Sequence, residues 1–384
     1  MNPLPYAAAR KERYSLRIAI LGTKGIPARY GGFETFAEQL ALRMAARGHA
    51  ITVYAENPDS KERPDEMVEG VRVRYRRRPP LGAASVLAYD CSCLWDARKN
   101  YDLVYMLGYG AAWACWLPRV FGVPVWINVD GLEWSRSKWG RFARMYLRAM
   151  EWVSSWTATR VIADARAMAE RFQRLYRRGA PCSYLAYGAP LVTDDQVGKD
   201  LLARWALQAG SYFLVVARAE PENHILEIIE GYLQHEGSWP LVVVSDVSGA
   251  TPYQRQLQKF AEPRVQFVGG VYHAPTLQAL RVHAGAYLHG HSVGGTNPSL
   301  LEALACGNWV VAHDNPFNRE VAGDAADYFS TPVQLAQQLN SWAQRTPFER
   351  QKRAEAARQV IRSRYHWEDI ADAYEELMLQ ECGR

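Results

Sequence analysis

The order of the apolar segments constrains the fold of this chain more than any other feature. Short apolar runs alternate with stretches of helical periodicity over residues 17–163, and the same alternation restarts at residue 212. Residues 17–21 form one such run, and residues 34–47 repeat apolar side chains at i, i+4 spacing. This alternation predicts an α/β protein built from two doubly wound parallel sheets.

The two halves are joined by a segment, ending near residue 210, that lacks a strand-like run. Strands are predicted at residues 17–21, 51–55, 71–75, 103–107, 123–129, 160–163, 212–217, 241–245, 265–268, 286–289 and 309–312. Helices are predicted between most of these strands, and an amphipathic helix is predicted over residues 367–380. Two such halves facing each other place a ligand at the carboxyl ends of both sheets.

Cysteine spacing, apolar run length and charge exclude several classes of protein. The six cysteines are scattered without a Cys-x-x-Cys pair or a histidine cluster, which predicts a reduced, cytoplasmic protein. Residues 1–17 lack the apolar core of a signal peptide, and the longest uncharged run, between Asp102 and Arg119, is too short to span a bilayer. The net charge of +5 comes with no recognition motif, so no nucleic-acid partner is predicted.

One basic and aromatic segment, residues 134–160, has two interpretations. Its members are Arg136, Lys138, Arg141, Arg144 and Arg148, with Trp134, Trp139, Phe142, Tyr146, Trp152 and Trp156. A helix of this composition can lie in the headgroup layer of an anionic membrane. It can equally be an ordinary amphipathic helix with solvated arginines.

A glycine-rich loop follows the first predicted strand. Residues 22–35 include Gly31 and Gly32 directly before a predicted helix, together with Lys24 and Arg29. Glycines let the backbone approach a bulky anion, and the N-terminus of a helix offers unpaired N–H groups to a diphosphate. The loop matches neither the dinucleotide fingerprint nor the P-loop, and a plain turn is the alternative.

Two further loops leave strands of the second half. Arg218 follows a strand end, where a guanidinium suits a phosphate, although a surface salt bridge is the alternative. Residues 289–304 contain two adjacent glycines, then Asn297 and Pro298, which suit the cap and first turn of a helix. Glu302, about one turn in, can accept hydrogen bonds from ribose hydroxyls or serve as a helix-dipole charge. The histidines of this loop are predicted to be satisfied within it.

These segments resemble the GT-B retaining glycosyltransferases of glycosyltransferase family 4, and most closely the bacterial rhamnosyltransferase-like branch. The matching stretches, within a resemblance running from about Leu16 to Met378, are residues 25–35, 129–134, 220–223, 289–299 and 314–320. The resemblance implies a Rossmann-like acceptor-side domain at residues 14–190 and a Rossmann-like nucleotide-sugar-binding domain at residues 191–366. It also implies a C-terminal helix, residues 367–384, that packs back on the first domain.

The resemblance also implies roles for individual residues. Gly31, Gly32, Arg218, Asn223 and Glu302 would bind the nucleotide and its phosphates. The loop around the donor sugar would contain His291, Gly294, Gly295, Thr296 and Asn297. Asp130 would be catalytic, and the acceptor side would contain Lys24, Arg29 and Glu133.

Three positions depart from the family pattern. Gly294 replaces a glutamate that contacts the donor sugar, Asn223 replaces a lysine near the phosphates, and Val129 replaces a histidine before Asp130. A 6-deoxy sugar lacks the usual hydroxyl pattern and would suit such a site, which favours dTDP-rhamnose as the donor.

The activity that the resemblance implies is transfer of rhamnose to a lipid-linked saccharide of cell-surface polysaccharide synthesis, which would place the enzyme at the inner face of the cytoplasmic membrane. No Asp-x-Asp motif occurs, so no metal and no cofactor beyond the substrate nucleotide sugar are expected. The alternatives are a UDP- or GDP-hexose donor, a protein that binds a nucleotide sugar without transferring it, and a nucleotide-sugar epimerase.

Overall fold

The computed structural model describes residues 14–28, 31–57, 63–129, 131–136, 138–192 and 197–384. Within these residues the N-terminal sheet has the strand order β3-β4-β2-β1-β5-β6-β7-β8, and only β3 runs antiparallel to its neighbour. Its strands are β1 Arg17–Leu21, β2 Ala50–Asn57, β3 Glu66–Val68, β4 Val71–Arg77, β5 Leu103–Leu107, β6 Val125–Asn128, β7 Arg160–Ala163 and β8 Cys182–Tyr184.

The C-terminal sheet is parallel throughout, with the order β11-β10-β9-β12-β13-β14. Its strands are β9 Phe213–Val216, β10 Leu241–Val244, β11 Val265–Phe267, β12 Ala286–His289, β13 Val310–His313 and β14 Ala326–Phe329. In both sheets the strand order reverses direction beside the first strand, between β1 and β5 and between β9 and β12. Ligands of open α/β sheets bind at such switch points, outside the carboxyl ends of the strands.

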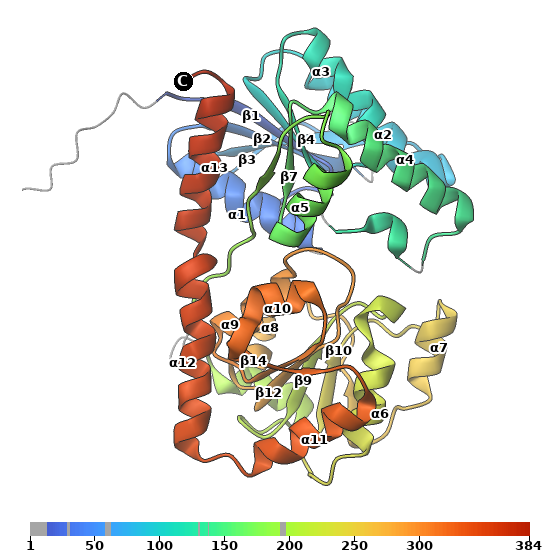
Figure 1. Ribbon diagram of the computed structural model, residues 1–384, viewed down its shortest axis with the longest axis vertical. Coiled ribbons are helices and arrows are strands. Elements are labelled where there is room, and N and C mark those ends of the chain that lie inside the picture. The colour runs from blue at the N-terminus through green and yellow to red at the C-terminus, as the bar shows by residue number, and fades with distance from the viewer. Residues whose placement is uncertain (1–13, 29–30, 58–62, 130, 137, 193–196) are drawn as a thin grey trace, which may run out of the picture.

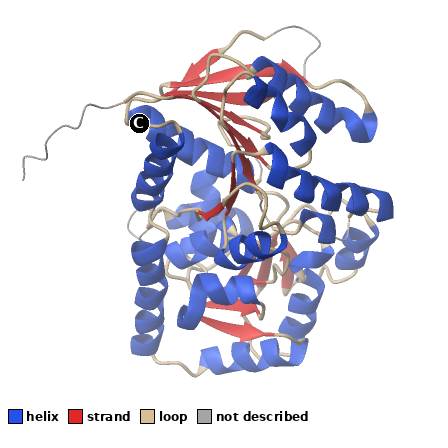
Figure 2. Cartoon of the chain, turned by 45° about the horizontal axis from the view of Figure 1, so that its top comes forward, coloured by secondary structure: helices blue, strands red, loops and turns tan. Residues whose placement is uncertain are grey.

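Helices cover both faces of each sheet (Figure 2). The α-helices are α1 Gly32–Ala46, α2 Ser85–Asp96, α3 Trp116–Val120, α4 Arg141–Thr157, α5 Arg166–Leu175, α6 Ile225–Leu233, α7 Pro252–Gln258, α8 Ala274–Val282, α9 Pro298–Ala305, α10 Pro316–Ala322, α11 Pro332–Ala343, α12 Pro347–Arg364 and α13 Trp367–Glu381. Short 3-10 turns include η2 Ala112–Cys115, η3 Glu133–Ser135, η5 Lys199–Trp205 and η6 Pro221–Asn223. Among the described residues, no helix is long and apolar enough to cross a bilayer.

The hydrophobic core is divided by the sheets. Helices α1 and α13 pack on one face of the N-terminal sheet, while α2, α4 and α5 pack on the other. In the C-terminal sheet, α8, α9 and α12 cover one face, and α6 and α11 cover the other. The buried cluster under α1 continues through Tyr187 and Ala189 into the C-terminal half, so both halves share apolar contacts.

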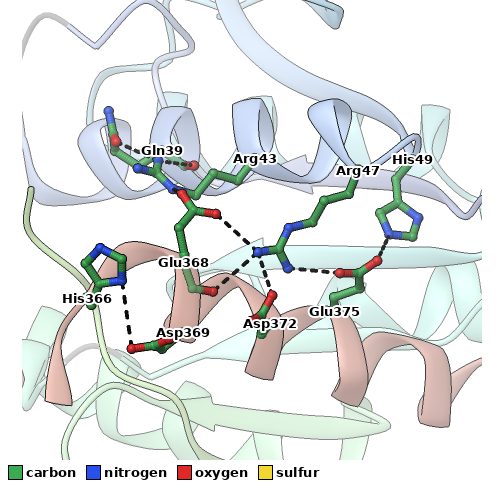
Figure 3. A network of polar contacts seen from close by, with 9 residues as sticks. All are labelled: Gln39, Arg43, Arg47, His49, His366, Glu368, Asp369, Asp372 and Glu375. Carbon is green, nitrogen blue, oxygen red and sulfur yellow. Dashed lines mark hydrogen bonds and ion pairs between the residues drawn. The ribbon is translucent and has the colours of Figure 1, made fainter. Parts of the chain in front are cut away.

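The C-terminal helices join the two halves (Figure 1). Helix α12 packs on α9, and the chain then passes His366 into α13, which lies against α1. Arg47 on α1 contacts Asp372 at 2.7 Å and Glu375 at 2.9 Å, and His49 lies 3.0 Å from Glu375 (Figure 3). The predicted return of the last helix to the N-terminal domain is therefore confirmed.

Candidate active site

A cleft of about 1380 Å³ lies between the carboxyl ends of the two sheets. Both switch points open into it, because Leu107 of β5 and His289 of β12 line its walls. The sequence-predicted residues that line it are Lys24, Gly31, Gly32, Glu133, Arg218, Asn223, His291, Gly294, Thr296, Asn297 and Glu302. Gly295 is not among the lining residues, and the predicted Asp130 and Arg29 lie outside the described residues.

The glycine-rich loop forms the N-terminal wall beside β1. Gly22 has a φ of 82°, and a Cβ there would lie 2.1 Å from the Leu107 carbonyl oxygen, so the loop requires a glycine at this turn. Glu34 of α1 accepts a hydrogen bond from the Lys24 backbone N–H at 3.1 Å and holds the loop against the helix. Within the described part of the chain no side chain caps the first turn of α1, which begins at Gly32 in the cleft wall. This helix N-terminus is therefore open to an anion.

Arg218 and Asn223 belong to the loop after β9. The Arg218 side chain is exposed in the cleft wall, and the structure gives its guanidinium no ion pair or hydrogen bond within the described residues. Asn223 is buried, and its Nδ2 donates to the Arg218 carbonyl at 2.8 Å. Its Oδ1 lies 2.8 Å from His291 Nδ1. Asn223 thus shapes the loop that presents Arg218, and both of its amide groups are engaged within the protein.

The two histidines of the 289–304 loop, His289 and His291, differ in their hydrogen-bond partners. His291 Nε2 lies 2.8 Å from the Val293 carbonyl and its Nδ1 lies 2.8 Å from Asn223 Oδ1, and the neutral ring donates a hydrogen bond to one of these two acceptors. His289 is more deeply buried, and its Nε2 has no hydrogen-bond partner among the described residues. Burial lowers the pKa of His289 to about 3 and that of His291 to about 4, with nearby positive groups adding to the effect. Both rings are neutral near pH 7.

Helix α9 starts at the cleft with the predicted cap. Asn297 Oδ1 accepts a hydrogen bond from the Ser299 N–H at 2.9 Å, and Pro298 occupies the first helical position. Glu302 lies one turn further and pairs with Arg281 of α8 at 2.5 Å. The Arg281 side chain is only 8% exposed, whereas Glu302 is 31% exposed toward the cleft. Arg281, which sequence reasoning missed, therefore fixes the Glu302 carboxylate in place.

The loop predicted to surround a sugar also touches the N-terminal domain. A Cβ on Gly294 would lie 2.2 Å from the Gly131 Cα, so the two backbones approach each other as only glycine allows. The Thr296 N–H donates to Asp164 Oδ2 at 2.8 Å, and its hydroxyl donates to the Asp164 carbonyl. The Thr296 side chain is thus engaged in holding the domains together.

The 314–320 segment supports this loop from behind. Asn315 caps α10, and the amides of Asn315 and Asn318 donate to the His291 carbonyl at 3.1 and 2.9 Å. Glu320 accepts hydrogen bonds from the N–H groups of Arg166 and Ala167 at the start of α5. The segment therefore positions the 289–304 loop and bonds the two domains.

Glu133, predicted on the acceptor side, is engaged locally. It contacts Arg136 at 2.7 Å and Lys138 at 2.9 Å, and it accepts a hydrogen bond from Trp139 Nε1 at 3.0 Å. Its carboxylate thus orders the loop between η3 and α4, and this loop forms one edge of the cleft.

Sequence reasoning missed a polar group in the N-terminal wall. Asp90 of α2 lines the cleft near Glu56 and Arg78, and Arg78 Nη1 contacts both Glu56 oxygens at 3.1 and 3.2 Å. Burial raises the pKa of Asp90 to about 7, with a contribution from the Glu56 charge. The available signal was an acidic residue within an otherwise apolar helix segment, which is too common to be specific.

Each half of the chain matches a known family model. Residues 206–360 match the family model described as Glycosyl transferases group 1, and residues 16–190 match the model described as Domain of unknown function (DUF1972). No curated protein matches the chain.

Solved structures share the arrangement of the whole chain. Sucrose-phosphate synthase from Thermosynechococcus elongatus has a TM-score of 0.80 at 18% identity, over 95% of this chain and 98% of that chain. HepE from Anabaena, in complex with UDP and glucose, has a TM-score of 0.76 at 17% identity, over 95% and 100%. The catalytic domain of starch synthase IV from Arabidopsis thaliana, bound to ADP and acarbose, has 0.73 at 11% identity, over 97% and 100%. At these identities the likeness shows the fold.

Fold, cleft and family match together define the class of this protein. It has the GT-B fold, and its residues 206–360 match the glycosyl transferases group 1. Within that class it combines a C-terminal domain of the glycosyl transferases group 1 with an N-terminal DUF1972 domain.

Proposed function

We propose that this enzyme transfers L-rhamnose from dTDP-rhamnose to a lipid-linked saccharide, with retention of configuration and without a metal ion. The observation that carries the proposal is the meeting of two helix N-termini in the cleft wall, that of α1, which begins at Gly32, and that of α9, which Asn297 caps. A Cβ built on Gly32, at the start of α1, would lie 3.4 Å from Pro298 at the start of α9. A diphosphate bound beside both termini would face the positive ends of both helix dipoles.

Arg218 and Glu302 complete the proposed donor site. Arg218 is the exposed cation of the C-terminal wall and would bind the diphosphate through charge-assisted hydrogen bonds. Glu302, oriented by Arg281, would accept hydrogen bonds from the two ribose hydroxyls. The site is thus proposed to hold the nucleotide in the C-terminal domain and the acceptor against the N-terminal wall.

The proposed reaction needs no protein nucleophile. The acceptor oxygen forms a bond to the anomeric carbon on the face from which the diphosphate leaves, and the acceptor proton passes to the departing phosphate oxygen. The helix N-termini and Arg218 would stabilise the negative charge that develops on the leaving group. Asp130 is proposed to orient the acceptor hydroxyl.

The proposal of a 6-deoxy donor sugar rests on Gly294. Because a side chain at this position would collide with Gly131, no carboxylate can reach the sugar from here while the two loops touch. A sugar that lacks one hydroxyl needs fewer such contacts, which supports a 6-deoxy-hexose. HepE is a structural relative whose complex contains UDP and glucose, so a UDP-hexose is the second candidate.

Calorimetry with dTDP-rhamnose, UDP-glucose, UDP-galactose and GDP-mannose, without added metal, distinguishes the donors. We expect selective binding of dTDP-rhamnose. A preference for a UDP- or GDP-sugar would retain the glycosyltransferase and exclude rhamnose. Binding of none of them would contradict the proposed donor site.

We also propose that an anionic membrane surface binds α3, α4 and the end of α2, here called the basic aromatic face. The α4 part exposes Arg141, Arg144, Arg148, Phe142, Met145, Trp152 and Trp156. Glu151, the acidic residue of α4, points inward and pairs with Arg171. The exposed side of this helix is therefore positive and apolar, as membrane-surface helices are.

The basic aromatic face continues beyond α4 and reaches the cleft. Arg119 of α3 donates to the Trp156 carbonyl at 2.8 Å, and Lys99 lies 4.7 Å from the Phe121 ring. Trp95, Trp113 and Trp116, which are close to Lys99 and Arg119 in sequence, are also exposed. Phe142, at the other end of α4, lines the cleft. A lipid-linked acceptor held at the membrane would thus have a short path to the transferred sugar.

A further inference from the structure

Contacts among the described residues do not explain why the carboxyl of Asp90 lies in the wall of the cleft. Asp90 is 6% exposed, lines the cleft, and has no hydrogen bond or ion pair to its carboxyl among the described residues. Because Asp90 lines the cleft, the contents of the cleft are the remaining source of a hydrogen-bond partner for its carboxyl. A ligand in the cleft would supply the missing partner.

The neighbours of Asp90 do not supply that partner. Arg78 directs its Nη1 to Glu56 and donates from Nε to Ser85 Oγ at 2.9 Å. Ser85 Oγ in turn donates to the Pro79 carbonyl at 2.6 Å. These bonds fix the start of α2 against β2 and β4 and leave the Asp90 carboxyl facing the cleft.

The site lies beside the glycine-rich loop. The Tyr89 hydroxyl donates to the Thr23 carbonyl at 3.5 Å, and the Glu56 N–H donates to the Lys24 carbonyl at 3.2 Å. Asp90 follows Tyr89 on α2, so it belongs to the same wall as the loop proposed to face the donor phosphates. The surrounding cleft residues are largely apolar: Val86, Leu87, Tyr89, Met106 and Leu107.

We infer that Asp90 binds a hydroxyl group of the saccharide acceptor, an inference that rests on the glycosyl transfer proposed above. A wall that combines apolar side chains with a buried carboxyl suits a pyranose, whose C–H faces pack on apolar side chains while its hydroxyls need polar partners. A phosphate is disfavoured, because the Glu56 and Asp90 carboxyls would repel it. A carboxyl that is protonated in part near neutral pH can both donate to and accept from a hydroxyl.

Two substitutions separate this role from a structural one. Asp90→Asn keeps one donor and one acceptor at the site, whereas Asp90→Leu removes both in a similar volume. Asp246→Leu is the matched control, because Asp246 lines the opposite wall of the same cleft and is exposed. The probes are octyl β-D-glucopyranoside, octyl β-D-galactopyranoside and octyl α-L-rhamnopyranoside, below their micelle concentrations.

Saturation-transfer NMR reports glycoside binding, and calorimetry with dTDP and UDP reports the nucleotide site separately. We expect transfer to the ring protons of at least one glycoside in the wild type, Asp90→Asn and Asp246→Leu. We expect its affinity to fall about fivefold or more in Asp90→Leu, as for one lost hydrogen bond. Nucleotide binding should be equal in the wild type, Asp90→Asn and Asp90→Leu.

Unchanged glycoside binding in Asp90→Leu would overturn the inference, and so would a wild type that binds none of the probes. If Asp90→Leu fails to fold, loss of glycoside binding in the folded Asp90→Asn would also contradict it. Absence of nucleotide binding beside an Asp90-dependent glycoside signal would refute the proposed glycosyl transfer and leave the saccharide site standing.

Discussion

Arg218 and Glu302 both line the cleft, but the surroundings of their side chains differ. Arg218 is exposed, and the described residues give its side chain no partner, so its removal leaves no buried group uncompensated. Glu302 compensates the buried Arg281, so Glu302→Ala would also leave a buried cation unpaired, at a cost of about 3–5 kcal/mol. Glu302→Gln is the cleaner test, because the amide oxygen can still accept from Arg281.

We predict that Arg218→Ala weakens nucleotide binding about 10- to 100-fold, as expected for charge-assisted bonds of about 1.5–3 kcal/mol. Glu302→Gln should weaken it less, with the melting temperature kept. Calorimetry measures both, and Arg362→Ala and Glu355→Gln, an exposed pair on α12 outside the cleft, are the matched controls. Wild-type affinity in both cleft variants would refute the assignment.

His289 gives the fold a dependence on pH. Its pKa is about 3 in the folded protein, against an ordinary value of 6.5, because burial disfavours the charged ring. The unfolded chain therefore binds the proton first. Stability is fully present above pH 6.5 and falls as the pH drops toward 3, by at most about 1.4 kcal/mol per pH unit for this group.

We predict that His289→Leu loses less stability than the wild type between pH 6.5 and 4.5. Urea unfolding at several pH values within this window measures the difference. His273→Leu, at an exposed histidine, controls for loss of an imidazole. Equal slopes in His289→Leu and the wild type would show that this ring is not the group responsible.

At the scale of single elements, α4 carries the proposed membrane contact. Phe142 is 84% exposed and Trp152 and Trp156 are each 54% exposed, beside the arginines of the basic aromatic face. We predict that the wild type co-sediments with phosphatidylglycerol vesicles at low salt and that Phe142→Ala/Trp152→Ala/Trp156→Ala does not. High salt should weaken binding, because it screens the arginines.

Phe348→Ala is the matched control for this experiment. Phe348 is 75% exposed, but it lies on α12 of the C-terminal domain, away from the basic aromatic face. Its removal should leave sedimentation unchanged. If the wild type stays in the supernatant at low salt, α4 is an ordinary solvated helix.

The elements that the sequence predicted well are those buried on both faces. Strands β1, β5, β7 and β12 have the predicted bounds, because central strands of a parallel sheet are continuous apolar runs. The edge strands β3, β8 and β14 were missed, since they are short and their exposed sides carry polar residues. The domain boundaries remain a prediction.

At the scale of the whole molecule, the domains meet through short polar and backbone contacts beside the cleft. Gly294 meets Gly131, Thr296 bonds to Asp164, and Glu320 bonds to the start of α5. These contacts pair residues more than 130 positions apart, so no local sequence pattern predicts them. Sequence reasoning therefore identified the loops of the site but assigned Gly294 and Thr296 to the sugar alone.

We predict that Gly294→Ala opens the molecule. Its Cβ would lie 2.2 Å from the Gly131 Cα, so the two loops must separate. Gly210→Ala is the matched control, because Gly210 has a similar φ of 77° but nothing within 4 Å of an added Cβ. Small-angle X-ray scattering should report a larger radius of gyration for Gly294→Ala only. Equal radii for both variants would contradict a locking role for this contact.

The central claim is that the cleft transfers a sugar from a nucleotide donor with retention. The most direct test is to incubate the enzyme with dTDP-rhamnose and a bacterial lipid-linked saccharide fraction, and to determine the new linkage by NMR. The account predicts a glycolipid product whose rhamnose keeps the anomeric configuration of the donor, and none with Arg218→Ala. An inverted linkage would contradict the mechanism, and dTDP-rhamnose that is neither transferred nor hydrolysed would contradict the transfer of rhamnose.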